Sequence, residues 1–190
     1  MRRQVPNILT VLRFPLAAVF LYGFFQPSVS WRLAATACFI LSALTDTFDG
    51  LLARKMGAIT GVGAFLDPLA DKVLVLSGFF ALMLRPDLPW GGWKHVIIVS
   101  VLLIALREVG ITVLRWVRVT GDRPLVTSFW GKAKTTTEMV TLIVALLTFN
   151  LLELYGLQLP VLIHLVAVGV VGSALLAVYS GLGYLRIVRT

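Results

Sequence analysis

Long apolar segments, each separated from the next by a short polar stretch, make up nearly the whole chain. Each is close to or above about 20 residues, the length at which a helix crosses the hydrocarbon core of a bilayer. The segments lack the alternation of barrel strands, and in lipid only helices or closed barrels satisfy the backbone. The pattern therefore predicts transmembrane helices at residues 8–25, 31–52, 64–84, 93–117, 129–152 and 159–187.

Clusters of proline, glycine and charged residues divide these segments, as at Pro27, Pro86 and Gly121. We expect one all-α domain over residues 1–190, a polytopic bundle of six transmembrane helices with a polar cavity that faces the cytoplasm. The first segment is predicted to be a retained span and not a cleaved signal peptide, because Pro6 and Pro15 interrupt it and further spans follow.

Composition and charge agree with a membrane protein. Charged residues make up 14% of the chain, against about a quarter in soluble domains, and the mean hydropathy is +0.93. The net charge of +8 indicates anionic lipid or phosphate as partners and not nucleic acid, since no soluble basic face exists. All Lys and Arg except Arg32, Arg85 and Lys94 fall on the side of both termini. This bias predicts a multi-pass protein of the inner (cytoplasmic) membrane with both termini in the cytoplasm.

Four aspartates stand out because ionisable residues in a membrane segment are costly. Asp46 and Asp49 lie near the end of the second predicted span, and Asp67 and Asp71 lie near the start of the third. Spacings of three and four place each pair on one helix face. Carboxylates this close repel one another unless cations neutralise them. Hard oxygen ligands in this number suit two divalent cations, Mg²⁺ or Mn²⁺.

Glycines and an arginine lie within the same stretch. Gly50 follows Asp49 directly, and Arg54 lies shortly before Gly57, Gly61 and Gly63. Glycine is unfavourable in a helix, so a dense set indicates the close approach of a ligand or of a neighbouring helix. The planar cation of arginine suits phosphate. Acids, metals, glycines and an arginine together predict a pyrophosphate site.

The stretch from Asp46 to Asp71 reads D-x-x-D-G-x-x-A-R, eight residues, then G-x-x-x-D-x-x-x-D. It resembles the signature of the CDP-alcohol phosphotransferase family, whose six-span bundle also has both termini in the cytoplasm. The resemblance implies a divalent-metal-dependent enzyme in which an acceptor hydroxyl attacks the diacylglycerol-bearing phosphate of CDP-diacylglycerol and CMP leaves.

The resemblance also implies roles for individual residues. Asp46, Asp49 and Asp67 would hold the two cations, with Asp71 at the second cation. Asp71 would also be the general base that deprotonates the acceptor hydroxyl. The residues implied to bind the CDP donor are Asn7, Thr10, Asp46, Gly50, Arg54 and Thr60.

Three further segments resemble bacterial phosphatidylglycerophosphate synthases, whose acceptor is sn-glycerol 3-phosphate. They are residues 5–13, residues 67–72, and the pair Arg107-Glu108 together with residues 128–135. The phosphate of this acceptor carries nearly two negative charges, which basic side chains can bind. The predicted acceptor-phosphate-binding residues are Arg107, Lys132, Lys134 and Arg118.

Other interpretations stay open. Glu138 lies one turn after Lys134, and Glu108 follows Arg107, so both cations can instead have structural partners. Another acceptor would make the chain a cardiolipin synthase or a phosphatidylinositol-phosphate synthase. A metal-ion transporter is disfavoured, because its acids would lie near the midplane and often within inverted repeats.

Small residues in the last predicted span indicate close helix packing. Gly169 and Gly172 lie near Ser173, and such residues let membrane helices approach one another closely. We expect a homodimer, for which this segment is a candidate interface.

Overall fold

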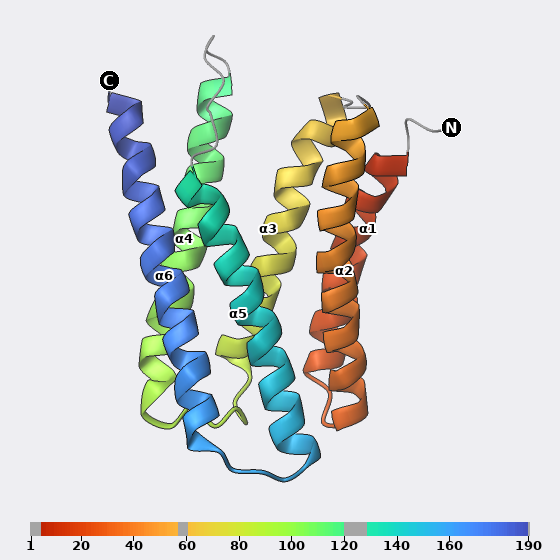
Figure 1. Cartoon of the computed structure of the whole chain (residues 1–190), viewed down its shortest axis with the longest axis vertical. Helices are drawn as coiled ribbons and strands as arrows, with labels where there is room; N and C mark the ends of the chain where they lie inside the picture. The colour runs from red at the N-terminus through yellow and green to blue at the C-terminus, as the bar shows by residue number, and fades with distance from the viewer. Residues whose placement is uncertain (1–4, 57–60, 120–128, 190) are drawn as a thin grey trace. The chain divides into compact units, whose positions relative to one another are not determined.

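The computed structural model describes residues 5–56, 61–119 and 129–189, and for some helical residues it describes only the backbone. These residues form six α-helices and one 3-10 helix, with no strand among them (Figure 1). The helices are α1 (Val5–Phe24), α2 (Val29–Met56), α3 (Gly61–Leu84), η1 (Gly91–Trp93), α4 (Lys94–Val119), α5 (Phe129–Leu154) and α6 (Pro160–Arg189). The predicted all-α class is confirmed, and each predicted span coincides with one α-helix to within a few residues.

The helices form two compact units, which are described separately below. The first unit comprises Met1–Pro86 and Leu146–Leu157. The second unit comprises Asp87–Ala145 and Gln158–Thr190. The helix α5 contributes its beginning to the second unit and its end to the first.

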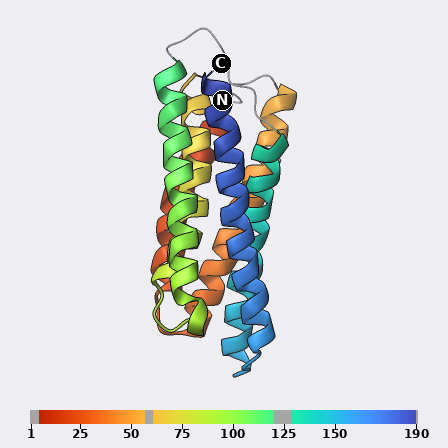
Figure 2. The same ribbon diagram turned by 90° about the vertical axis from the view of Figure 1, so that its left-hand side faces the viewer.

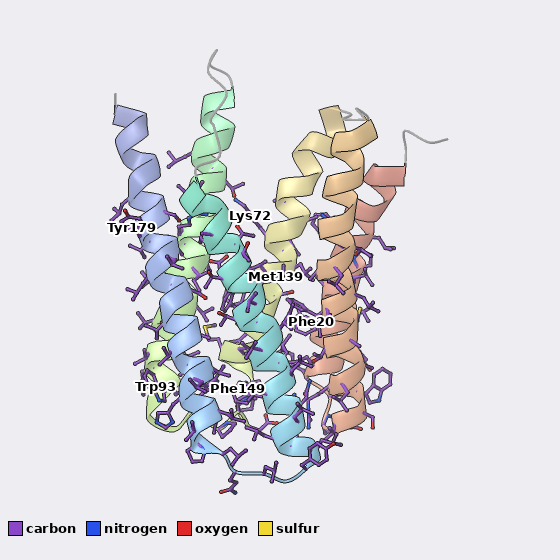
Figure 3. All side chains as sticks on the ribbon, viewed as in Figure 1. Phe20, Lys72, Trp93, Met139, Phe149 and Tyr179 are labelled. Atoms are coloured by element: carbon purple, nitrogen blue, oxygen red, sulfur yellow. The ribbon has the colours of Figure 1, made fainter. Side chains whose placement is uncertain are left out.

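In the first unit α1 packs against both α2 and α3 (Figure 1). The ring of Phe20, which is labelled in Figure 3, lies 5.6 Å from that of Phe24 and 5.0 Å from that of Phe39 between centroids, and all three side chains are buried. Gly23 brings α1 close to α2, because a Cβ there would lie 3.0 Å from the Cβ of Ala35. Aromatic rings and a small residue thus form the contact between these two helices.

The helix α1 continues through Pro15. A proline removes one backbone hydrogen bond, a loss that membrane helices tolerate where neighbouring groups compensate. Pro6 lies in the first turn, where its missing N–H has no helical partner in any case. The first predicted span, residues 8–25, includes Pro15, and α1 confirms that the helix continues through it.

Arg85 stabilises the end of α1. Its Nη1 donates a hydrogen bond to the carbonyl oxygen of Phe24 at 2.5 Å, and its guanidinium lies 5.0 Å from the centroid of the Phe24 ring. The last carbonyl groups of a helix lack helical donors and carry partial negative charge. A buried cation at this position compensates both deficits.

Arg32 has a similar role in the turn that follows α1. Its Nη1 donates to the carbonyl oxygens of Gln26 at 3.1 Å and Pro27 at 2.9 Å. The guanidinium also forms an ion pair with Glu153, near the end of α5. Arg32 and Arg85 are two of the three basic residues that the sequence places away from the termini. Their contacts show that both hold the fold of the first unit together.

In the second unit α4 and α6 lie side by side (Figure 2). Both helices expose apolar side chains at intervals of three, four or seven residues, which is the spacing of one helix face. The exposed residues include Val99, Leu103, Leu106, Val109 and Val113 on α4 and Val161, Leu165, Val168, Leu175 and Leu182 on α6. Soluble monomers rarely expose apolar patches of this extent, so these faces indicate contact with lipid.

Three described segments are long and apolar enough to cross a membrane, namely Gly91–Leu114, Ala133–Leu154 and Pro160–Gly183, with mean hydropathies of 2.3, 1.6 and 2.5. Shorter apolar segments lie in the helices of the first unit, at Leu12–Phe24, Val29–Thr45 and Lys72–Leu84. The chain thus has the character of a membrane protein, while six complete spans stay a prediction.

The close packing predicted around Gly169 is confirmed within one chain. A Cβ at Gly169 would lie 3.2 Å from Cγ2 of Thr141 on α5. The hydroxyl of Ser173 donates to that of Thr141 at 3.2 Å. A Cβ at Gly172 would have no atom within 4 Å. The face of Gly169 is therefore a contact between α6 and α5, and the homodimer stays a prediction.

Candidate active site

The four signature aspartates lie on two adjoining helices of the first unit. Asp46 and Asp49 belong to α2, and Asp67 and Asp71 belong to α3. Their side chains lie outside the described set, so their positions follow from the helical backbone alone. The two helices contact one another and are linked by residues 57–60. Neighbouring helices joined in this way run in opposite directions, as Figure 1 shows.

This antiparallel arrangement places the aspartates at two levels. Asp49 lies seven residues before the end of α2 and Asp67 lies six residues after the start of α3, which is about 10 Å along either helix. Asp46 and Asp71 each lie ten residues from the same helix ends, which is about 15 Å. Each level therefore holds one aspartate from each helix. Two levels with two hard oxygen donors each suit a pair of divalent cations.

The residues predicted to bind the donor belong to the same unit. Gly50 and Arg54 lie on α2, and Asn7 and Thr10 lie on α1, which packs against α2. Thr60 lies outside the described residues. Only the backbones of the other four residues are described, so their predicted roles follow from helix membership and not from side-chain contacts.

The residues predicted to bind the acceptor phosphate belong to the second unit. Arg107 and Arg118 lie on α4, and Lys132 and Lys134 lie on α5. The side chains of Arg118 and Lys132 are outside the described set. Those of Arg107 and Lys134 are described, and both belong to a hydrogen-bonded charge network.

The network joins three helices. Oε1 of Glu108 accepts hydrogen bonds from Nη1 of Arg107, at 2.7 Å, and from Nζ of Lys134. The same Nζ lies 2.7 Å from Oε2 of Glu138. Nη2 of Arg107 donates to Oγ of Ser180 on α6 at 3.1 Å. The pairings of Arg107 with Glu108 and of Lys134 with Glu138 that the sequence suggests are thus confirmed.

The network is buried and balanced in charge. The side chains of Lys134 and Glu138 are 2% and 1% exposed, against 12% for Arg107. Among the described side chains two cations face two carboxylates, and pairing of this kind lets buried charges persist.

The sequence alone did not identify Ser180 or Gly181 as members of this region. A Cβ at Gly181 would lie 3.2 Å from Cγ of Arg107, so the absence of a side chain there leaves room for the arginine. The sequence feature that could have indicated a close contact here is the run Ser180-Gly181-Leu182-Gly183 in an apolar segment. Small residues on a membrane helix mark a close approach, but they do not say which side chain approaches.

A cavity of about 540 Å³ lies at the beginning of α4 and of α6. Its lining includes Trp90, Trp93, Pro160 and His164. The rings of Trp93 and His164 meet edge to face with centroids 5.9 Å apart, and Nδ1 of His164 lies 2.6 Å from the carbonyl oxygen of Pro160. The lining holds no carboxylate or basic side chain besides the histidine, so we assign no chemistry to this cavity.

Comparison with known proteins identifies the class of the chain. Residues 3–182 match the family described as CDP-alcohol phosphatidyltransferase, and the chain belongs to this family. A probable phosphatidylglycerophosphate synthase of Mycobacterium tuberculosis is 38% identical over 191 residues, covering 95% of this chain and 79% of that protein.

Two other relatives carry the name CDP-diacylglycerol–glycerol-3-phosphate 3-phosphatidyltransferase. The protein of Haemophilus influenzae is 32% identical over 192 residues, covering 100% of this chain and 95% of its own length. That of Escherichia coli K12 is 41% identical over 145 residues, covering 75% of this chain and 76% of its own length.

Proposed function

We propose that the chain transfers the phosphatidyl group of CDP-diacylglycerol to sn-glycerol 3-phosphate, giving phosphatidylglycerophosphate and CMP. The observation that carries this proposal is the complete family signature, set out as four aspartates at two levels of two packed helices. Relatives named for this reaction support the choice of donor and acceptor.

Two divalent cations, Mg²⁺ or Mn²⁺, would be held by Asp46, Asp49, Asp67 and Asp71. Cations bound there would stabilise the attacking and the departing oxygens of an in-line displacement. The two levels of aspartates lie about one helical turn apart along α2 and α3. The proposed ligands of the cations are carboxylate oxygens only, and Mg²⁺ and Mn²⁺ prefer such oxygen ligands.

The chain's own residues would bind the donor and move one proton. Arg54 would pair with the diphosphate of CDP-diacylglycerol, and Gly50 would let the donor approach the backbone of α2. Asn7, Thr10 and Thr60 would complete the donor site. Asp71 would accept the proton of the acceptor hydroxyl as its oxygen attacks the phosphorus that bears diacylglycerol. The bond from that phosphorus to the CMP oxygen breaks, and CMP leaves.

The acceptor carries a phosphate that is nearly dianionic. The basic residues of the second unit, Arg107, Arg118, Lys132 and Lys134, would bind or support this phosphate through charge-assisted hydrogen bonds. A neutral acceptor such as free inositol would not need them. This excess of basic residues favours glycerol 3-phosphate over uncharged alcohols.

The exposed apolar faces of α4 and α6 support a position in the membrane. We place the chain in the inner membrane as a multi-pass protein with six spans, both termini in the cytoplasm and a polar cavity open to that side, following the distribution of Lys and Arg. A homodimer is part of this proposal and rests on the small residues of α6 alone.

A panel of acceptors tests the proposed reaction. Purified protein supplied with CDP-diacylglycerol and Mg²⁺ is expected to release CMP with glycerol 3-phosphate. The expected kcat/KM is at least about a hundredfold higher than with phosphatidylglycerol or inositol phosphate, because polar sites reject ligands that leave their groups unpaired. CMP release measured by chromatography, with mass spectrometry of the lipid, checks this. Faster turnover of either alternative acceptor would reassign the chain to that branch of the family.

A further inference from the structure

We infer that Lys134 is a positioning residue and not a ligand of the acceptor phosphate. It holds Glu108 in place, and Glu108 in turn orients the guanidinium of Arg107, which binds the phosphate. This inference rests on the proposed function, because it concerns how the acceptor site of that reaction is built.

The first argument is the accessibility of the two cations. The side chain of Lys134 is 2% exposed, and its ammonium lies between carboxylate oxygens of Glu108 and Glu138. A phosphate could reach it only by displacing one of these carboxylates. The side chain of Arg107 is more exposed, at 12%. Of the two cations, Arg107 is therefore the one that a ligand can reach.

The second argument is the supply of hydrogen-bond donors. A guanidinium has five N–H groups in a rigid plane, a geometry that matches phosphate. Arg107 donates one bond from Nη1 to Glu108 and one from Nη2 to Ser180, so the second N–H of each of these nitrogens remains, whereas its Nε is buried without a partner among the described residues. Donors thus remain for a phosphate. The bonds to Glu108 and Ser180 fix the plane of the guanidinium. Without such bonds, the plane of an arginine side chain would not be fixed.

The third argument is charge. Among the described residues, the network contains two cations, Arg107 and Lys134, and two carboxylates, Glu108 and Glu138. Removal of Lys134 alone leaves one cation and two carboxylates, an excess of one negative charge beside the phosphate site. Removal of the charges of both Lys134 and Glu138 restores the balance between Arg107 and Glu108. A positioning role and a ligand role therefore predict different outcomes for the double variant.

The test compares Lys134→Met, Glu138→Gln and the double variant. Lys134→Met is expected to raise the KM for glycerol 3-phosphate by at least about tenfold while the KM for CDP-diacylglycerol stays unchanged. The double variant is expected to return the acceptor KM to within about threefold of the wild type. The reason is that Glu138→Gln removes the buried carboxylate that Lys134→Met leaves without its cation. Lys94→Met, which removes an exposed lysine at the start of α4, is the control and should leave both KM values unchanged.

If the double variant keeps the full rise in acceptor KM, Lys134 binds the phosphate directly and the inference is wrong. If Lys134→Met does not fold, Gly181→Ala tests, without changing charge, the part of the inference that assigns the acceptor phosphate to Arg107. A Cβ at Gly181 meets the Arg107 side chain at 3.2 Å, so the acceptor KM should rise. Gly183→Ala, where a Cβ meets nothing within 4 Å, should not change it. Equal acceptor KM values for these two variants would also overturn the inference.

Failure of this inference can be told from failure of the proposed function. The wild type alone, in the acceptor panel, decides which alcohol is used. If another phosphorylated alcohol is preferred, the KM comparisons are made with that alcohol. The thermal unfolding midpoint without substrates tests the network independently: Lys134→Met should lower it and the double variant should restore most of the loss. A double variant as unstable as Lys134→Met would contradict the charge balance.

Discussion

Asp71→Asn is expected to lower CMP release by at least about a thousandfold at saturating substrates, within the range ascribed to a lost general base. The asparagine side chain has nearly the same shape, but it cannot accept the proton of the acceptor hydroxyl. It also offers one oxygen where the carboxylate offers two, which weakens the binding of a cation. Single-turnover assays of CMP release in detergent micelles measure the loss.

Binding of the donor should survive in part, because Gly50 and Arg54 on α2 are unchanged. The dissociation constant for CDP-diacylglycerol, measured by displacement of a fluorescent analogue, is expected to rise by about tenfold at most. Asp87→Asn, an exposed carboxylate outside the signature, is the matched control and should keep normal turnover. Near-normal activity of Asp71→Asn would remove this residue from the role of base.

Arg32→Met is expected to destabilise the first unit strongly. The arginine is 1% exposed and its hydrogen bonds satisfy the carbonyl oxygens of Gln26 and Pro27. Methionine keeps most of the volume but none of the donors, so these carbonyls lose their arginine donor. A loss of charged hydrogen bonds in a buried site costs about 2–4 kcal/mol of unfolding free energy. Thermal unfolding of the purified protein, followed by circular dichroism, measures it.

The partner of Arg32 provides the control. Glu153 is 46% exposed, so Glu153→Gln loses only a solvent-screened interaction and should cost less than about 1 kcal/mol. The prediction is thus an asymmetry, with a large loss at the arginine and a small one at the glutamate. Equal effects at both positions would show that the ion pair, and not the carbonyl contacts, is the source of the stability.

The sequence predicted the helices well because their cause is local. Apolar runs long enough to cross a bilayer can satisfy their backbone only as helices, and proline and glycine mark the turns between them. Pro15 is a breaker that lies inside both the first predicted span and α1. Its effect depends on the groups that surround the helix, and these groups come from other parts of the chain.

The sequence places the signature aspartates on α2 and α3, and the site that they would form stays a prediction, because their side chains lie outside the described set. Spacings of three and four residues place the aspartates on single faces of α2 and α3, and the adjoining connection brings the helices together. The charge network shows where local reasoning ends. The pair Lys134–Glu138 follows from helical spacing, whereas the contact of Arg107 with Ser180 joins residues 73 positions apart. Such contacts depend on how helices pack.

The basic residues away from the termini illustrate the same limit. In the count of Lys and Arg on the two sides of the membrane, Arg32 and Arg85 were exceptions to the distribution that predicts topology. The structure shows that they bind carbonyl oxygens at and after the end of α1. Their position reflects the need of unpaired backbone acceptors for donors, which the distribution of charge along a sequence does not reveal.

The central claim is that the acceptor hydroxyl attacks the phosphorus bearing diacylglycerol. Glycerol 3-phosphate labelled with oxygen-18 in its C1 hydroxyl tests this claim directly, with the lipid and nucleotide products analysed by mass spectrometry. The label is expected to be retained in phosphatidylglycerophosphate, and CMP is expected to be unlabelled. Labelled nucleotide, or the absence of a labelled lipid while CMP is released, would contradict the proposed reaction.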